Sequence, residues 1–222
     1  MGDVIGEFLA YAVGVAVSPV PIAAVLLMLV TKQARTNGPL FLLGWLAGLG
    51  VVGVIVLLIP GLEASQGEPS TTSGAIKGVL GILLLLVGAK AWRSRPVGDE
   101  VAEAPGWMTK IDEFGGATSL GMGFLLSALN PKNLLLAVAG AATISAAALS
   151  TSEQYIALAV FVVLASLTIL VPVLLFLILG EKAEQAMTTT RDWMIQNNQT
   201  VMSVLILVLS VSMIGDAIEI LF

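Results

Sequence analysis

The amino-acid sequence predicts an all-α membrane protein with six transmembrane helices, arranged as two inverted three-helix repeats with proline-broken first and fourth helices. Apolar residues make up 57% of the 222 positions and charged residues 11%, whereas soluble globular domains have roughly half and a quarter. Six stretches approach the length of about 20 apolar residues that a helix needs to cross a bilayer. Two proline pairs share one spacing, since 131 − 19 = 112 and 172 − 60 = 112. This equal spacing indicates an internal duplication.

The first predicted span lies close to the start of the chain. Met1-Gly2-Asp3-Val4 carries an acid where a secretory signal peptide has basic residues, and no small-residue cleavage site follows, so we expect this span to be retained. Inside the span, Ser18-Pro19-Val20-Pro21 interrupts the apolar run. Proline lacks a backbone N–H and clashes with the preceding turn, so a broken helix is predicted here. The six predicted spans are residues 4–30, 40–59, 74–91, 117–148, 155–179 and 201–222.

The second and third spans complete a first repeat over residues 1–95, and a polar loop over 60–73 joins them. Turn-forming and small polar residues without a periodic apolar face predict that this loop is exposed. The following segment is polar, acidic and bounded by prolines. We therefore expect residues 96–113 to form a cytoplasmic linker.

The second repeat, residues 114–222, also contains three spans, and Asn130-Pro131-Lys132-Asn133 interrupts the first of them. Because three crossings separate equivalent points, the two repeats are expected to run through the membrane in opposite directions. Residues 181–198 mix charges and amides with Met and Trp, which predicts a short amphipathic helix at the membrane interface before the last span. The two repeats together are expected to form one integral membrane domain.

The basic residues predict the orientation of the spans. Eight of them fall in loops or at span ends on one side, whereas only Lys77 falls on the other and Lys132 lies well inside a span. By the positive-inside rule the basic side is cytoplasmic, so both termini are predicted to lie outside. The alternative, with both termini inside, requires translocation of the basic loops. The eight residues are Lys32, Arg35, Lys90, Arg93, Arg95, Lys110, Lys182 and Arg191.

The two proline breaks are the candidate site for substrate binding and translocation. Pro19 stands 19 − 4 = 15 residues into its span and Pro131 stands 131 − 117 = 14 residues into its own, so both are expected near the middle of the bilayer. The new helix starts would present backbone N–H donors and the positive end of a helix dipole. Ser18 and Asn130 are expected to cap these starts. The alternative is a pair of kinks that only shape packing. The candidate residues are Ser18, Pro19, Pro21, Asn130, Pro131, Lys132 and Asn133.

Lys132 is a charged side chain that is expected near the middle of the bilayer, beside Pro131. A charge at the centre of a bilayer costs several kcal/mol, and such residues usually face a cavity or a partner. Lys132 is therefore a candidate for attracting an anionic group or for coupling transport to protons, and the alternative is that it snorkels to the cytoplasmic face. Asp216 and Glu219 in the last span are further coupling candidates, or they simply reach water. Four hydroxyl residues are expected to bond within their own helices: Thr143, Ser145, Ser166 and Thr168.

The sequence lacks the residues that several classes of function require. The chain has no cysteine and no histidine, which excludes disulfides and disfavours metal binding and metal efflux. No nucleophile with a base and no carboxylate pair is apparent, so we expect neither an enzyme nor a cofactor. No nucleic-acid partner is predicted. Small residues at four-residue steps in Gly44-Trp45-Leu46-Ala47-Gly48 and Gly74-Ala75-Ile76-Lys77-Gly78 predict packing seams between helices, with a homodimer face as the alternative.

The segments Ser18 to Val25 and Thr31 to Trp45, together with Asn130-Pro131-Lys132-Asn133 and Arg191-Asp192-Trp193, resemble the GAP family. These are peptidoglycolipid or sulfolipid-1 addressing (Sap-like) proteins of actinobacteria within the lysine-exporter (LysE) superfamily. The resemblance implies a multi-pass protein of the bacterial plasma membrane that exports a small molecule or moves glycolipids to the cell envelope. Its partners would be membrane lipids and a small-molecule or lipid cargo.

Three functions are compatible with the sequence. The first is a secondary transporter in which the repeats rock around the two breaks, so that access alternates between the faces of the membrane. The second is a membrane partner that assists envelope lipid assembly without transporting. The third is an amino-acid exporter of the same superfamily. A lysine exporter would need carboxylates for its cationic substrate, and the middle of these spans lacks them.

Overall fold

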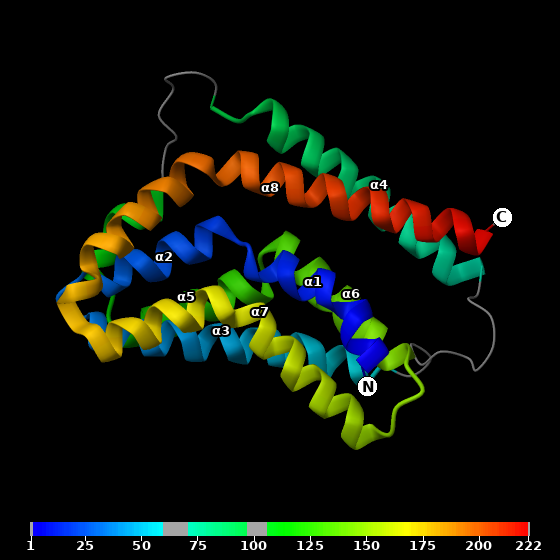
Figure 1. Cartoon of the computed structure of the whole chain (residues 1–222), viewed down its shortest axis with the longest axis horizontal. Coiled ribbons are helices and arrows are strands. Elements are labelled where there is room, and N and C mark those ends of the chain that lie inside the picture. The colour runs from blue at the N-terminus through cyan, green and yellow to red at the C-terminus, as the bar shows by residue number, and fades with distance from the viewer. Residues whose placement is uncertain (1, 60–70, 97–105, 222) are drawn as a thin grey trace. The chain divides into compact units, whose positions relative to one another are not determined.

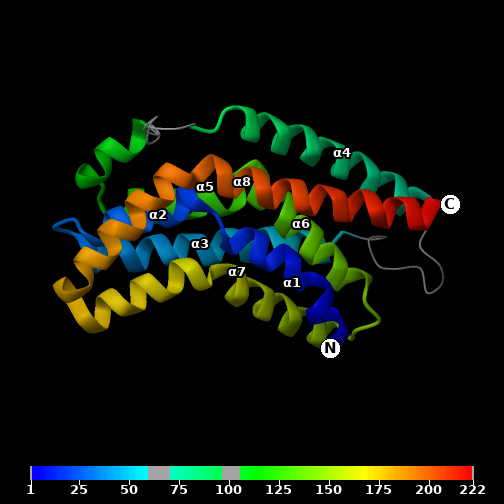
Figure 2. The same ribbon diagram turned by 45° about the horizontal axis from the view of Figure 1, so that its top comes forward.

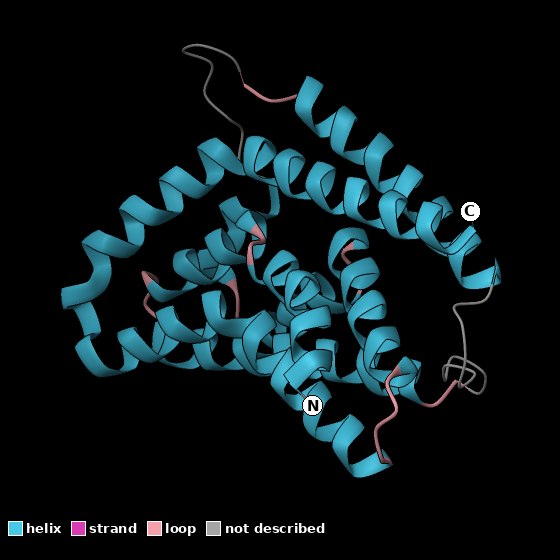
Figure 3. Ribbon diagram, turned by 45° about the vertical axis from the view of Figure 1, so that its right-hand side comes forward, coloured by secondary structure: helices cyan, strands magenta, loops and turns pink. Residues whose placement is uncertain are grey.

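The computed structural model describes residues 2–59, 71–96 and 106–221, and these form helices joined by short loops (Figures 1 and 3). The elements, in chain order, are α1 (Gly2–Ala16), α2 (Pro19–Leu29), α3 (Ala34–Leu57), α4 (Thr71–Arg93), the 3-10 helix η1 (Gly106–Glu113), α5 (Gly116–Ala128), α6 (Pro131–Ala146), α7 (Thr151–Leu179), the 3-10 helix η2 (Gly180–Ala183) and α8 (Glu184–Leu221). The prediction of an all-α protein is confirmed.

Within the described residues, three helices are long and apolar enough to cross a membrane, namely α3, α7 and α8. Two further candidates are bent pairs. The α1–α2 pair bends by 55° and the α5–α6 pair by 63°, each at a break of a few residues. Counting each pair as one span gives up to five spans. The two predicted proline breaks are thus confirmed as bends between paired helices, and the several long apolar helices indicate a multi-pass membrane protein. The third predicted span, residues 74–91, lies within α4.

The helices group into two compact units. Unit 1 combines Met1–Glu63 with Glu103–Ile195, and unit 2 combines Ala64–Ala102 with Gln196–Phe222. The first two spans of each proposed repeat therefore share unit 1, while α4 and the later part of α8 share unit 2. The units therefore do not coincide with the proposed repeats, whose boundaries are at 95 and 114.

In unit 1, α3 and α5 lie side by side (Figure 2) and pack through glycine. A Cβ on Gly44 would collide with the carbonyl oxygen of Leu120, and one on Gly123 would collide with that of Phe41. A Cβ on Gly48 would meet the Ser127 side chain. Since lipid tails are as apolar as leucine, such close backbone approach is what holds membrane helices together. The packing seam predicted at Gly44 and Gly48 is thus a contact between α3 and α5.

The α1–α7 contact is built differently. Phe8 and Phe161 meet edge to face, with ring centroids 5.7 Å apart and planes at 85°. Both rings are buried, and edge-to-face packing is a favoured aromatic geometry. Large side chains therefore fill the contact between α1 and α7.

Unit 2 is an antiparallel helix pair. Along α4, Gly74 faces Ile220, Gly81 faces Ile214 and Gly88 faces Leu207. The facing positions on α8 decrease as those on α4 increase, so the helices run in opposite directions. The second predicted seam, at Gly74 and Gly78, therefore packs against α8.

Two predicted segments differ from expectation. Residues 106–113 of the predicted linker form η1, in which Met108 and Ile111 are buried, because these two apolar side chains anchor the segment against the protein. The predicted separate helix at 181–198 begins with η2, but from Glu184 it continues unbroken into the last span as α8. No proline or glycine stands between 184 and 201 to end it. Residues 60–70 and 97–105, where the exposed loop and the rest of the linker were predicted, lie outside the described residues.

Candidate translocation site at the two broken helices

The first break leaves the last carbonyl groups of α1 without ordinary helical partners. Helix α1 ends at Ala16 and α2 begins at Pro19, because neither Pro19 nor Pro21 can donate a backbone hydrogen bond. The final four carbonyls of any helix need other donors. Val13 O accepts from Val17 N at 2.9 Å, and Ala16 O accepts from Ser18 N at 2.9 Å. The remaining carbonyls of this end accept from side chains.

Lys132 of α6 donates two hydrogen bonds to carbonyls at this break. Its Nζ donates to Gly14 O at 2.6 Å and to Val17 O at 3.1 Å, and the side chain is only 7% exposed. The C-terminal end of a helix carries partial negative charge, so a cation is favourable there. The ammonium group of α6 therefore caps the end of α1, and the side chain points into the protein instead of snorkelling to the surface.

Ser18 and Asn133 join the two breaks directly. Ser18 Oγ lies 2.8 Å from both Val15 O and Asn133 Oδ1, and its single proton can be donated to only one of them at a time. Asn133 Nδ2 donates to Leu126 O at 2.9 Å, which is a carbonyl near the end of α5. Both side chains are buried. The end of α1 and the end of α5 are thus bridged through one serine and one asparagine.

Thr168 of α7 completes the cluster. Its Oγ1 donates to Ala16 O at 2.6 Å, so the prediction that this hydroxyl bonds within its own helix is wrong. The carbonyl of Ala16 has lost its ordinary helical partner at the break. It lies within reach of the Thr168 hydroxyl and competes for it with the carbonyls of α7. Thr143 and Ser166 do bond within their helices, to Ala139 O and Val162 O. We name Ser18, Lys132, Asn133 and Thr168, with the α1 carbonyls they contact, the polar centre.

The second break is capped as predicted, whereas the first is not. Asn130 accepts from Lys132 N at 3.1 Å, which caps the start of α6. Ser18 makes no side-chain cap bond to α2, because its hydroxyl is turned to α1 and α6. Prolines also remove N–H donors from both helix starts. The polar centre is therefore built mainly from cation and carbonyl groups, and not from the paired amide donors that the sequence suggested.

The remaining candidate residues take other positions. Pro19 and Pro21 are buried, whereas Pro131 is exposed. Asp216 is half-buried and Glu219 is exposed, and both belong to unit 2. The hydrogen bonds of the polar centre involve neither acid.

An apolar groove opens beside the polar centre in unit 1. It has a volume of about 470 Å³, within the roughly 300–1,000 Å³ of typical small-molecule sites. Thr168 belongs to both the groove and the polar centre. The groove lining comes from three helices: Ile22 and Leu26 of α2; Leu167, Thr168, Val171, Pro172 and Leu175 of α7; and Ala186, Met187, Thr190 and Met194 of α8.

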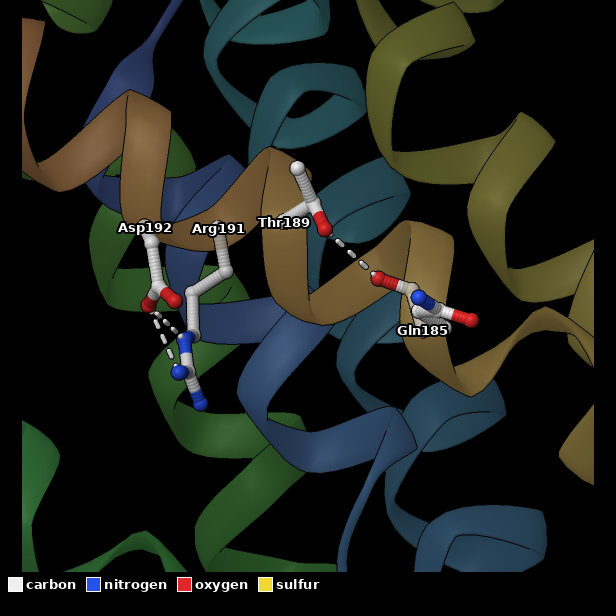
Figure 4. A network of polar contacts seen from close by, with 4 residues as sticks. All are labelled: Gln185, Thr189, Arg191 and Asp192. Atoms are coloured by element: carbon white, nitrogen blue, oxygen red, sulfur yellow. Dashed lines mark hydrogen bonds and ion pairs between the residues drawn. The ribbon is translucent and has the colours of Figure 1, made fainter.

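The Arg191-Asp192-Trp193 motif lies on the early part of α8 (Figure 4). Arg191 pairs with its neighbour Asp192, with Nε 2.8 Å and Nη2 2.6 Å from Oδ1. One turn earlier, Thr189 Oγ1 donates to Gln185 O at 3.0 Å. These bonds stay within α8, and none of them reaches the polar centre.

One of three comparisons with known proteins gives a match. Neither the curated proteins nor the solved structures give a match. The family model described as Sap, sulfolipid-1-addressing protein, matches residues 8–219, which include both breaks and every helix lining the groove. The chain therefore belongs to the Sap family of sulfolipid-1-addressing proteins.

Proposed function

We propose that this protein is a secondary exporter of a cell-envelope lipid or glycolipid component, with access alternating around the polar centre. The observation that carries the proposal is the direct contact between the two breaks, made by Lys132, Ser18 and Asn133. Paired broken helices that meet between two repeats are the usual setting for a transport site. Membership of a family implicated in sulfolipid addressing supports a lipid as cargo.

The proposal includes six spans, with α4 as the sixth, in two inverted repeats over 1–95 and 114–222. Helix α4 has 23 residues, enough to cross a hydrocarbon layer that needs about 20. The charge distribution supports a cytoplasmic position for the basic loops, with both termini outside the plasma membrane. The protein needs no catalytic group or cofactor for this role.

In this mechanism the hydrogen bonds of Lys132 hold the two proposed repeats together in the closed state. The Lys132 ammonium holds the end of α1 through two carbonyls, and a hydrogen bond to a charged group contributes about 1.5–3 kcal/mol. Rocking of one repeat against the other breaks these bonds and exposes the carbonyls and the ammonium to cargo or water. The glycine contact between α3 and α5 stays closed, since its backbones already touch. Asp216 and Glu219 remain candidates for proton coupling.

A second function is supported by the same cluster. Within the polar centre, every side chain is hydrogen-bonded to protein, which suits a stable scaffold that assists envelope lipid assembly without transporting. Amino-acid export is less well supported, because the groove beside the polar centre is apolar.

An untargeted comparison of lipids and metabolites inside and outside cells tests the proposal. Cells that contain the protein should place at least one lipid outside that cells without it retain. Lys132→Met should remove this difference, whereas Lys182→Met, which changes an exposed lysine of η2, should preserve it. Equal lipid distributions with and without the protein would leave the scaffold function as the better explanation.

A further inference from the structure

The groove in unit 1 has walls of regular helical spacing. Leu167, Val171 and Leu175 of α7 follow one another at four-residue steps, and Ile22 and Leu26 of α2 do the same. Residues four apart lie on one face of a helix, so each helix turns one apolar strip to the groove. From Leu167 to Leu175 the strip is about 12 Å long at 1.5 Å per residue. This elongated shape fits an extended hydrocarbon chain.

The α7 wall of the groove is open to the lipid side. Val171 and Leu175 are each 45% exposed in the described structure, although both are large apolar residues on a helix that is a candidate span. An acyl chain can therefore enter from the bilayer without crossing water. Yet lipid tails are as apolar as leucine, so an apolar wall alone gives little preference for one chain over another. Selection needs a polar feature.

Pro172 provides that feature. Proline has no N–H, so the carbonyl of Thr168, four residues earlier in α7, lacks its ordinary helical donor. Both residues line the groove. The Thr168 hydroxyl is already used, because it donates to Ala16 O at 2.6 Å. Thr190, across the groove on α8, donates its own hydroxyl to Ala186 O at 2.8 Å. The groove is therefore lined by Thr168, whose carbonyl has lost its ordinary helical donor, and by hydroxyl groups whose protons are committed.

We infer that this groove is a binding site for the acyl chain of the exported lipid, and that the Thr168 carbonyl accepts a hydrogen bond from a hydroxyl of its head group. This inference rests on the proposed export of a lipid and adds the position of the cargo. Because Thr168 also holds the end of α1, a bound head group would contact the residue that stabilises the closed polar centre. Cargo binding and opening of the break are thereby linked through one residue.

Photolabelling in nanodiscs of phosphatidylcholine, whose head group has no O–H or N–H donor, tests the site. The probe is a hexadecyl glucoside with a diazirine in its chain, and the comparison probe has the same chain with all sugar hydroxyls methylated. Peptide mapping should find saturable adducts in residues 22–26, 167–175 and 186–194. The glucoside should label these residues roughly threefold to tenfold more strongly than the methylated probe, as expected for one hydrogen bond.

One matched pair of variants and one single variant test the site further. Val171→Trp should fill the groove and reduce labelling at least fivefold, whereas Val163→Trp, on the same helix and 50% exposed, should leave it unchanged. Pro172→Ala restores an N–H for the Thr168 carbonyl and should remove the preference for the glucoside. Non-saturable labelling spread over all lipid-facing helices, equal for both probes in the unmodified protein, would show ordinary bilayer lipid and overturn the inference.

The outcome is separable from that of the proposed function. Unselective labelling together with intact lipid export would overturn the acyl-chain site and leave the exporter standing. Selective groove labelling, with no difference in lipid distribution between cells with and without the protein, would overturn the exporter and identify a static lipid-binding protein.

Discussion

Replacement of Lys132 by methionine removes the ammonium group from the polar centre and leaves a long, unbranched apolar side chain in its place. In the structure the ammonium donates to Gly14 O and Val17 O. The variant leaves both carbonyls without this donor in a buried environment, at a cost of about 1–3 kcal/mol each. Relief of the buried charge offsets part of this cost, because taking an ammonium out of water is itself unfavourable. We expect a net loss of about 2–4 kcal/mol.

The measurement is thermal unfolding of the purified protein in detergent, followed by tryptophan fluorescence. At roughly 2–4 °C per kcal/mol for a chain of this size, Lys132→Met should lower the Tm by about 5–15 °C. Lys182→Met removes an exposed lysine and should change the Tm by less than about 2 °C, because surface substitutions usually cost little. A Lys132→Met protein as stable as the unmodified one would refute the capping role of the ammonium.

Further substitutions test the other contacts. Gly44→Ala should destabilise the protein by more than about 2 kcal/mol, because the new Cβ would collide with the Leu120 carbonyl. The control Gly50→Ala, whose new Cβ would have nothing within 4 Å, should be neutral or stabilising by up to about 1 kcal/mol. Equal unfolding temperatures of the two variants would contradict the close α3–α5 contact. Thr168→Val should cost about 0.5–1.5 kcal/mol, because Ala16 O loses the Thr168 hydroxyl and keeps only the hydrogen bond from Ser18 N. Thr143→Val loses only a bond within its own helix and should cost less. Unfolding in detergent compares the two variants, and the reverse order would contradict the role of Thr168. The proposed orientation places residue 153 outside the membrane and residue 32 inside. In this cysteine-free chain, a single cysteine in place of Glu153 should therefore react with a membrane-impermeant maleimide in intact cells, and one in place of Lys32 should not. Labelling at position 32 alone would show the opposite orientation.

The helix breaks were predictable because their cause is local. Pro19 and Pro131 lack the N–H that a continuous helix needs, and each stands inside a long apolar run. The bends of 55° and 63° follow from this. The inward direction of Lys132 was also within reach of the sequence, since a charge inside a span needs a partner.

The partners in the polar centre were not predictable from local pattern. Lys132 and Gly14 are 118 residues apart, and Thr168 and Ala16 are 152 residues apart. Nothing near Thr168 in the sequence indicates that its hydroxyl leaves its own helix. The same holds for η1, where Met108 and Ile111 in a polar segment are buried although the composition suggested a tether.

The most direct test of the central claim uses the cysteine pair Ser18→Cys and Asn133→Cys in this cysteine-free chain. The side chains they replace lie within 2.8 Å of each other, so oxidation should join the two breaks. Lipid export measured in cells should stop when the pair is oxidised and recover when it is reduced, while the single Ser18→Cys variant should show no response to oxidation. Full cross-linking with undiminished export would contradict transport by separation of the two breaks.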